Sequence, residues 1–237
     1  METFLDGRVI VAQPQAGFRS GLDAVMLAAA VPALAGQRAL ELGAGAGTAS
    51  LCLAARVAGT LITGVEIDMS LVELARSNAA ANGSHCRFVA ADIFHMPQEL
   101  KQDFDQVFCN PPFHGEGQAS PEGARNLALS DGGKLSDWLK LGLQRTVSGG
   151  YFTALIRADR LAEALSALPL EGVSVLPLWP RTGEPAKRAI LQTRKGSRAP
   201  FALLPGLVLH QPQGAWTSEA DAVLRRGAAL ALTKAPL

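Results

Sequence analysis

Short apolar runs and longer helical stretches alternate along the chain from Arg38 to Leu191, with a turn after each. This alternation is typical of a parallel sheet wrapped by helices. Helices are expected over four stretches, Thr48–Val57, Ser70–Ala81, Leu135–Val147 and Arg160–Leu168. Seven strands are expected, at Arg38–Leu42, Leu61–Ile67, Arg87–Ala90, Phe104–Cys109, Gly150–Ile156, Val173–Leu178 and Arg188–Gln192. The pattern therefore predicts an α/β fold with a Rossmann-like sheet of seven strands.

Two segments lie outside this alternation, and the length of 237 residues allows one α/β core with small additions. Residues 1–35 predict a short N-terminal extension over the active site, with a strand at Arg8–Val11 and a helix at Asp23–Ala30. Residues 36–200 form the predicted core. Residues 201–237 predict a small C-terminal appendage, with a strand at Leu207–His210 and a final helix capped by Ser218. Within the core, Ser70 and Glu73 predict a capping box at the start of their helix.

Cysteine and histidine usage argues against a metal centre or a disulfide framework. The three cysteines are odd in number and widely spaced, and the four histidines are equally dispersed. The sequence therefore predicts chemistry without a metal. The first residues lack a cationic segment followed by an apolar run, and Pro, Gly, Arg or Asp interrupts the alanine-rich runs. A cytoplasmic protein without membrane attachment is the expectation.

A glycine-rich turn ends the first predicted strand of the core. The sequence Glu41-Leu42-Gly43-Ala44-Gly45-Ala46-Gly47 then opens a helix, so that the backbone can approach a ligand closely. Its G-x-G-x-G spacing differs from the G-x-G-x-x-G of dinucleotide sites, and no Walker lysine follows. The turn therefore fits a nucleoside without phosphate groups better than a dinucleotide.

Carboxylates stand at the ends of the next two predicted strands. Glu66 can accept hydrogen bonds from both hydroxyls of a ribose, as an acid does in dinucleotide folds. Asp92 can accept from an adenine amine, while Ile67 and Ile93 pack on the two faces of the ring. Alternatively, Glu66 or Asp68 caps the next helix and Asp92 is an ordinary turn residue. Because strand ends converge on one crevice, the turn and the two acids together predict an adenosine-containing cofactor.

The tetrapeptide Asn110-Pro111-Pro112-Phe113 follows the fourth predicted strand. An aryl amine is a poor nucleophile because its lone pair is delocalised into the ring. The Asn110 side-chain oxygen and the Pro111 carbonyl can each accept one N–H, which frees the lone pair for attack on a methyl group. Phe113 offers a stacking face for an extruded base. The alternative is a proline-stiffened turn with Phe113 in the core.

These residues resemble the motif of the class I S-adenosylmethionine-dependent amino-methyltransferases, which is Asn or Asp followed by Pro-Pro and an aromatic. Most of the chain is similar to the tRNA adenine-N6 methyltransferases that modify the adenine beside the anticodon of a valine tRNA. The similarity includes residues 18–24, Pro185-Ala186-Lys187-Arg188 and residues 203–210. Residues 18–24 border the cofactor in such enzymes. The expected S-adenosylmethionine contacts are therefore Asp23, Glu41, Gly43, Ala44, Gly45, Gly47, Glu66, Ile67, Asp92, Ile93 and Asn110.

Local charge supports a nucleic-acid partner, although the net charge is only +1. Six basic residues lie between Arg181 and Arg198 against a single acid, an asymmetry that attracts phosphate. Lys187, Arg188, Arg194 and Lys195 are the predicted RNA contacts. A solvated hairpin, kept soluble by its charges, explains the same pattern.

Three alternatives to adenine methylation of tRNA remain open. Guanine-N2 methylation of ribosomal RNA is one, because Asn-Pro-Pro-Phe-His, here Asn110 to His114, recurs in such enzymes. N5-methylation of a protein glutamine is another, but the glutamine enzymes carry a helical domain before the core, and the short N-terminal segment leaves no room for it. A nucleotide-binding module without catalysis is the third, and the intact Asn110 and Phe113 argue against it.

Overall fold

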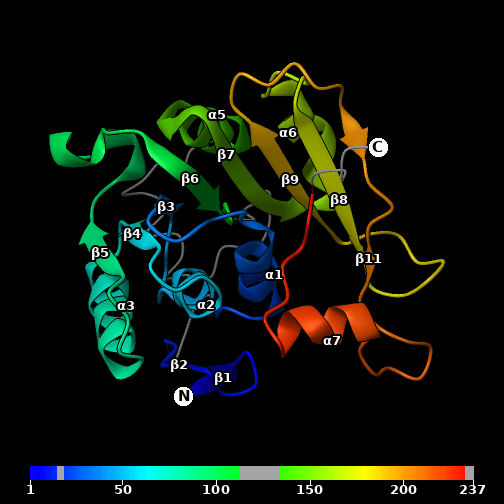
Figure 1. The fold of residues 1–237 in the computed structure, drawn as a ribbon, viewed down its shortest axis with the longest axis horizontal. Coiled ribbons are helices and arrows are strands. Elements are labelled where there is room, and N and C mark those ends of the chain that lie inside the picture. The colour runs from blue at the N-terminus through cyan, green and yellow to red at the C-terminus, as the bar shows by residue number, and fades with distance from the viewer. Residues whose placement is uncertain (15–18, 113–133, 233–237) are drawn as a thin grey trace, which may run out of the picture.

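The sheet runs through the middle of the molecule in the computed structural model, which describes residues 1–14, 19–112 and 134–232 (Figure 1). Its order is β10-β8-β9-β7-β6-β3-β4-β5, with β11 also paired to β8. The seven longer strands are β3 (Arg38–Leu42), β4 (Leu61–Glu66), β5 (Arg87–Ala90), β6 (Phe104–Cys109), β7 (Thr146–Arg157), β8 (Val173–Trp179) and β9 (Arg188–Arg194). Each overlaps a predicted strand, which confirms the Rossmann-like α/β fold.

Two short strands from the tail extend the sheet to nine strands. They are β10 (Ala202–Leu203) and β11 (Leu207–Val208), and both pair in parallel with β8. The predicted strand at Leu207–His210 is thus shorter than expected, and β10 is an addition. Inside the sheet, β9 is antiparallel to both of its neighbours, β7 and β8. The eight other strands all run in one direction, because every pairing that does not involve β9 is parallel and β9 is antiparallel to both β7 and β8, so their carboxyl ends meet at one edge.

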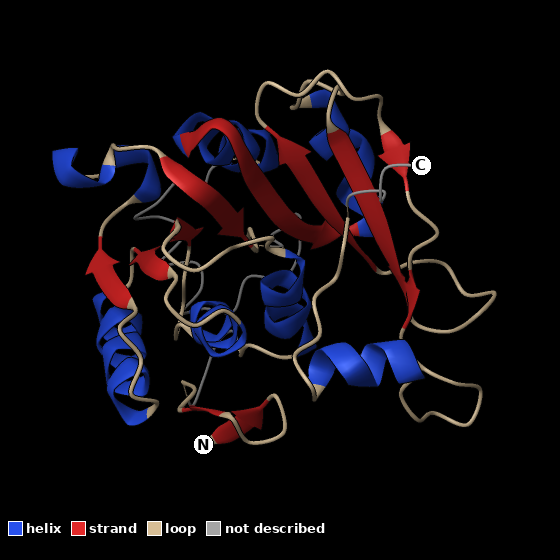
Figure 2. Cartoon of the chain, in the orientation of Figure 1, coloured by secondary structure: helices blue, strands red, loops and turns tan. Residues whose placement is uncertain are grey.

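Helices cover both faces of this sheet (Figure 2). One apolar core lies between the sheet and three helices, α1 (Leu22–Ala30), α2 (Thr48–Arg56) and α3 (Met69–Ala81). A second core lies on the other face, beneath α5 (Leu135–Arg145) and α6 (Leu161–Ser166). Three short 3-10 helices complete the connections, η1 (Ile93–His95), η2 (Gln98–Leu100) and η3 (Ala158–Arg160). None of the helices in the described ranges is long and apolar enough to span a membrane.

Two predicted helix caps are wrong by one or two residues. The capping box at Ser70 does not form, because α3 begins at Met69 and the Asp68 carboxylate accepts from the Ser70 N–H at 2.8 Å. Asp68 keeps an extended backbone as the chain leaves β4, which places its side chain over the first turn. In the tail, α7 (Ser218–Leu224) is capped by Thr217 and not by Ser218, which already lies inside the helix.

The N-terminal segment forms a hairpin of β1 (Glu2–Phe4) and β2 (Val9–Val11) that lies against α3. Asn78 of α3 and Asn82, the C-cap residue of that helix, pair with the backbone of the hairpin segment as a neighbouring strand would. Asn82 exchanges hydrogen bonds with the N–H and C=O of Ile10, and Asn78 does so with Ala12. Asn78 also donates to the carbonyl of Ala46 in the glycine turn. The segment is therefore fixed beside that turn, while its predicted position over the active site stays a prediction.

Candidate active site

Three strand ends lie next to one another where the order of the sheet reverses. Leu42 of β3 pairs with Val65 of β4 and with Cys109 of β6. The next residues along these strands are Gly43, Glu66 and Asn110. Because the connections from β3 and β6 leave in opposite directions along the sheet, this is the switch point at which open α/β folds bind ligands. The structure thus brings the predicted glycine turn, Glu66 and Asn110 together.

The glycine turn needs its glycines for two different reasons. Gly43, Gly45 and Gly47 have φ angles of 68°, 54° and 83°, in the left-handed region that favours glycine. A Cβ on Gly47 would come within 2.7 Å of the Phe88 ring, so its absence allows α2 to pack on the sheet. A Cβ on Gly45 would meet nothing within 4 Å. Gly45 therefore faces open space and leaves room for a ligand.

Glu66 ties this turn to the end of β4. One carboxylate oxygen accepts from the Gly45 N–H at 2.8 Å, and the other accepts from the N–H groups of Ile67 and Asp68. The side chain of Ile67 beside it is half exposed. The carboxylate is therefore held between the end of β4 and the glycine turn, and its predicted contact with ribose hydroxyls stays a prediction.

Asp92 begins the turn after β5 and caps η1. Its carboxylate accepts from the Phe94 N–H at 2.9 Å and pairs with Nδ1 of His95 at 2.7 Å. Ile93 is buried in the second core, unlike the exposed Ile67. These contacts within the turn are those of the alternative, an ordinary turn residue, and the predicted packing of both isoleucines on an adenine ring stays a prediction.

Glu41 lies inside the protein and has its own partner. It is 4% exposed and accepts from the Ser50 N–H at 3.0 Å and from the Ser50 hydroxyl. Burial raises the pKa of Glu41 from 4.5 to about 8, and the hydrogen bonds from Ser50 only partly oppose this rise. The carboxyl group thus joins β3 to α2, and its predicted cofactor contact is not seen among these bonds.

Stability should therefore depend on pH through Glu41. Because its pKa is raised in the folded state, its contribution to stability is fully present below about pH 4.5 and is lost as the pH rises to about 8. Glu41→Gln keeps an acceptor for Ser50 and cannot ionise. We expect the free energy of unfolding of the wild type, relative to this variant, to fall between about pH 5 and 8 in urea titrations. A difference that stays constant over this range contradicts the shift.

Asn110 carries the most informative polar atom of the site. Its Oδ1 is buried and has no hydrogen-bond partner among the described residues. A buried acceptor without a hydrogen bond lowers stability by roughly 1–3 kcal/mol, and an incoming N–H donor would recover this free energy. Pro111 is buried and Pro112 is exposed, whereas Phe113 lies outside the described residues. Burial raises the pKa of the Cys109 thiol beside Asn110, so this cysteine remains protonated.

Asp23 and Arg188 form an ion pair that the sequence did not reveal. The Arg188 Nε donates to the Asp23 carboxylate at 3.0 Å, which joins α1 to the start of β9. Asp23 was predicted to contact the cofactor and Arg188 to contact RNA. Since 165 positions separate them in sequence, no local pattern could have paired them. The pair lies at the carboxyl edge, where Arg188 is opposite Arg157 at the end of β7.

The predicted basic stretch does not form one surface. Lys187 and Arg188 stand at the carboxyl edge, but Arg194 and Lys195 lie at the other end of β9, roughly 20 Å away at 3.3 Å per residue. Lys195 donates to the carbonyls of Gln144 and Thr146 there. Arg194 donates to the Gly149 carbonyl and lies over the Tyr151 ring. The latter two side chains thus tie β9 to neighbouring backbone, and their contact with RNA stays a prediction.

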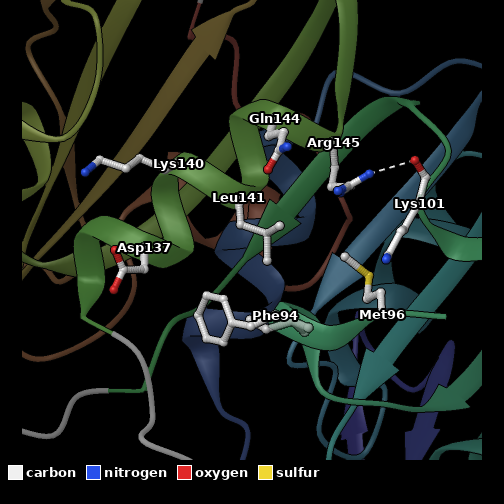
Figure 3. Close-up of a pocket in the computed structure, with 9 residues that line it drawn as sticks. Phe94, Met96, Lys101, Asp137, Lys140, Leu141, Gln144 and Arg145 are labelled. Carbon is white, nitrogen blue, oxygen red and sulfur yellow. Dashed lines mark hydrogen bonds between the residues drawn. The ribbon is translucent and has the colours of Figure 1, made fainter. Parts of the chain in front are cut away.

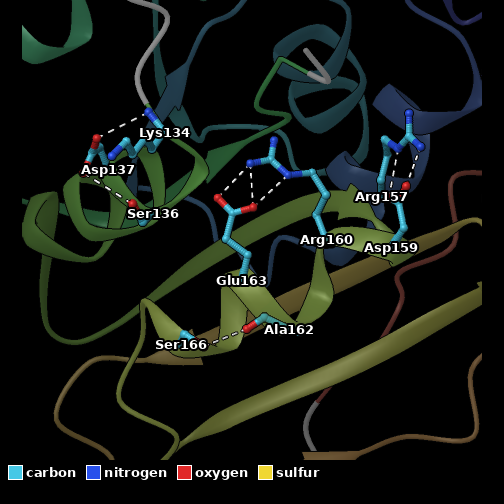
Figure 4. A network of polar contacts seen from close by, with 9 residues as sticks. All are labelled: Lys134, Ser136, Asp137, Arg157, Asp159, Arg160, Ala162, Glu163 and Ser166. Atoms are coloured by element: carbon cyan, nitrogen blue, oxygen red, sulfur yellow. Dashed lines mark hydrogen bonds and ion pairs between the residues drawn. The ribbon is translucent and has the colours of Figure 1, made fainter. Parts of the chain in front are cut away.

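An aromatic residue that the sequence analysis missed lies behind the glycine turn. The ring of Trp138 on α5 would be 2.8 Å from a Cβ on Gly43, and the Phe94 ring meets it edge-on at 6.2 Å. Two arginines near the carboxyl end of β7 are paired with adjacent acids (Figure 4). Arg157 pairs with Asp159 and Arg160 with Glu163. No spacing in the sequence links Trp138 to the glycine turn, and only the structure shows that its ring lies against Gly43.

The switch-point glycine turn, the acids beyond it and the unpaired Asn110 define a methyltransferase with an adenosine-containing methyl donor. Residues 19–136 match the family model of the methyltransferase small domain. The chain belongs to the class I S-adenosylmethionine-dependent methyltransferases, near the tRNA adenine-N6 family.

Comparisons with known proteins agree with this assignment. The tRNA1(Val) (adenine(37)-N6)-methyltransferase of Aeromonas hydrophila is 29% identical over 74% of this chain and 76% of its own length. The ribosomal RNA small subunit methyltransferase C of Salmonella paratyphi B is 33% identical over 56% of this chain, but the match covers only 41% of that protein. A predicted O-methyltransferase from Agrobacterium tumefaciens superposes with a TM-score of 0.72 and 27% identity, over 88% of this chain and 98% of that structure.

Proposed function

We propose that this protein methylates the exocyclic N6 amine of an adenine in tRNA, using S-adenosylmethionine. The observation that carries the proposal is the buried Asn110 Oδ1, an acceptor without a partner in the described ranges, at the strand end beside the glycine turn. An adenine amine has two N–H groups to offer such acceptors. The similarity to the tRNA1(Val) (adenine(37)-N6)-methyltransferase of Aeromonas hydrophila supports both the tRNA and the adenine.

The residues at the switch point fit the cofactor. Gly45 faces open space, and Thr48 Oγ1 is a second buried oxygen without a partner in the part of the chain that the structure describes. The glycine turn, Glu66 and Asp92 would hold the adenosine portion. When bound, S-adenosylmethionine supplies a methyl group on a positively charged sulfur. The polar groups at this site are backbone amides, carboxylates and one hydroxyl. Because the carboxylates accept hydrogen bonds and repel anions, the site suits a neutral nucleoside better than a phosphate.

The chain itself activates and orients the acceptor. Asn110 Oδ1 accepts one N–H of the amine and the Pro111 carbonyl accepts the other, which draws the nitrogen toward tetrahedral geometry and frees its lone pair. Pro111 offers no competing N–H donor and keeps the turn rigid. Phe113 is proposed to stack on the base, which must leave its neighbours to reach the site. The Asn110 Oδ1 atom and Pro111 are buried, and this low-polarity surrounding strengthens the proposed hydrogen bonds.

Other acceptors remain outcomes of the test. A guanine N2 amine also carries two N–H groups, and the Salmonella relative favours it, although that match is partial. A protein glutamine amide has the same delocalised lone pair. A hydroxyl acceptor, suggested by the name of the Agrobacterium structure, has a single hydrogen and would leave one of the two proposed acceptors unpaired.

Lys187 and Arg188 are the proposed phosphate contacts at the carboxyl edge, where a bound tRNA would reach the crevice. Arg188 also holds Asp23, so its replacement would disturb more than one contact. Lys187 is exposed and is the simpler of the two to test. A cytoplasmic location goes with a tRNA substrate and is proposed on that ground alone.

The deciding experiment follows transfer of a labelled methyl group from S-adenosylmethionine to three separate acceptors. They are unmodified valine tRNA transcript, ribosomal RNA and a protein fraction, each followed by mass analysis of the product. We expect N6-methyladenosine in the tRNA. N2-methylguanosine would support the first alternative, a 2′-O-methyl nucleoside would support O-methylation, and label confined to protein would overturn the RNA substrate.

A further inference from the structure

A cavity of about 370 Å³ lies between η1 and the outer surface of α5, and its lining shares only Ile93 with the expected cofactor contacts. Its volume is within the roughly 300–1,000 Å³ of small-molecule sites. In Figure 3, Leu141 and Phe94 lie in the middle, Lys101 and Arg145 lie on one side, and Asp137 and Lys140 lie on the other. The cavity thus combines an apolar wall with cations at both ends.

The charge of this lining favours an anion. Three cations, Lys101, Lys140 and Arg145, face one acid, Asp137. The acid already accepts hydrogen bonds from the Lys134 N–H and the Ser136 hydroxyl. The arginines near the carboxyl end of β7 differ, because Arg157 and Arg160 each pair with an adjacent acid (Figure 4). The described lining of the cavity therefore carries a net positive charge.

The anion-binding end lies between Lys101 and Arg145. Arg145 donates through Nη1 to the Lys101 carbonyl at 2.6 Å, which fixes its guanidinium there. Its Nε is buried and has no acceptor among the described residues. An unpaired buried donor beside an exposed ammonium suits a phosphate oxygen. Phe94, which is 38% exposed, offers an aromatic face at the apolar wall, where a base can stack.

We propose that this cavity binds a nucleotide of the substrate RNA other than the one that is methylated, with its phosphate at Lys101 and Arg145 and its base against Phe94 and Leu141. This inference rests on the proposed RNA substrate. Phe94 contacts Trp138, whose ring lies against the glycine turn, so the cavity is one aromatic layer away from the active site. A flanking nucleotide bound here would set the register of the RNA relative to Asn110.

Lys101→Glu and Leu141→Arg test the cavity in complementary ways. The first reverses a charge at the phosphate end, and the second fills the cavity while adding positive charge. Binding of unmodified valine tRNA transcript is measured over a range of salt concentrations, with S-adenosylmethionine affinity as the control for folding. Lys101→Glu should weaken tRNA binding about tenfold and reduce the salt slope by about one. Leu141→Arg should also weaken binding, although simple surface attraction predicts that it tightens.

Arg198→Glu is the matched control, because Arg198 is exposed in a separate basic hollow, which Arg194 and Lys195 also line at the end of β9, and undergoes the same change of charge. It should leave tRNA affinity close to that of the wild type. Tighter tRNA binding by Leu141→Arg, or equal losses for Lys101→Glu and Arg198→Glu, would overturn the cavity proposal. If the wild type methylates only protein, the proposed function fails. If wild type and Leu141→Arg methylate tRNA with the same KM, the cavity proposal alone fails.

Discussion

Asn110→Ala is expected to lower the rate of methyl transfer by about a hundred- to a thousandfold, the usual cost of losing one preorganised hydrogen-bond partner in a water-excluded site. In the proposed site, Asn110 would contact the target amine, whose activation matters in the transition state, whereas the glycine turn, Glu66 and Asp92 would hold the cofactor. Cofactor affinity and the folded structure should therefore change little. Single-turnover kinetics on tRNA, with calorimetry for S-adenosylmethionine, separates the two effects.

Asn110→Asp is the matched variant, because it keeps an acceptor oxygen at the same position. It should retain more activity than the alanine variant, since the amine still finds a hydrogen-bond acceptor. The Oδ1 atom has no partner in the described residues, so its removal breaks no hydrogen bond that the structure shows. A folded Asn110→Ala protein with near-normal turnover would mean that the turn is structural, and the amine-methyltransferase proposal would then be wrong.

Gly47→Ala should destabilise the protein by about 3 kcal/mol, from a left-handed backbone and an overfilled core. Gly47 has a φ of 83°, and an added Cβ would meet the Phe88 ring at 2.7 Å and the Ala75 Cβ at 3.2 Å. Ala75 and Phe88 are themselves buried, so neither has free space to move into. Urea unfolding measures the loss as a lower midpoint with an unchanged slope.

Gly45→Ala makes a useful comparison, because Gly45 has a similar backbone and an open surrounding. We expect this variant to lose about 1–2 kcal/mol of stability, from the strain of an alanine in the left-handed conformation alone. Its Cβ would instead enter the space proposed for the cofactor, so S-adenosylmethionine should bind more weakly. Equal stability losses in the two variants would show that the Phe88 contact is relieved by small movements. Unchanged cofactor affinity would place the ligand elsewhere.

The strand ends of the site were predictable because each depends on a local signal. A glycine-rich turn, an acid or an Asn-Pro-Pro sequence directly follows an apolar run, and parallel strands bring such positions to one edge. Helix caps were less predictable, since Asp68 and Ser70 are both good capping residues and only the backbone at Asp68 decides between them. The two tail strands are too short to show a period.

Long-range contacts could not be read from the sequence at all. The basic residues between Arg181 and Arg198 look like one patch along the chain, but β9 is extended and carries its ends to opposite edges. Glu41 looked like a cofactor contact because it belongs to the glycine-rich motif. Its burial against Ser50 depends on how α2 packs on β3, which local sequence does not encode.

The pairing of the tail with β8 has a consequence for how the protein is made. Among the described residues, β10 and β11 pair with the outer edge of β8, and both are synthesised after it. While the chain is still emerging from the ribosome, this edge exposes unpaired N–H and C=O groups that can recruit another nascent chain. Pairing of β10 and β11 with β8 is therefore expected to protect this edge from aggregation. The protection begins only when these last strands have been synthesised and have folded onto the sheet.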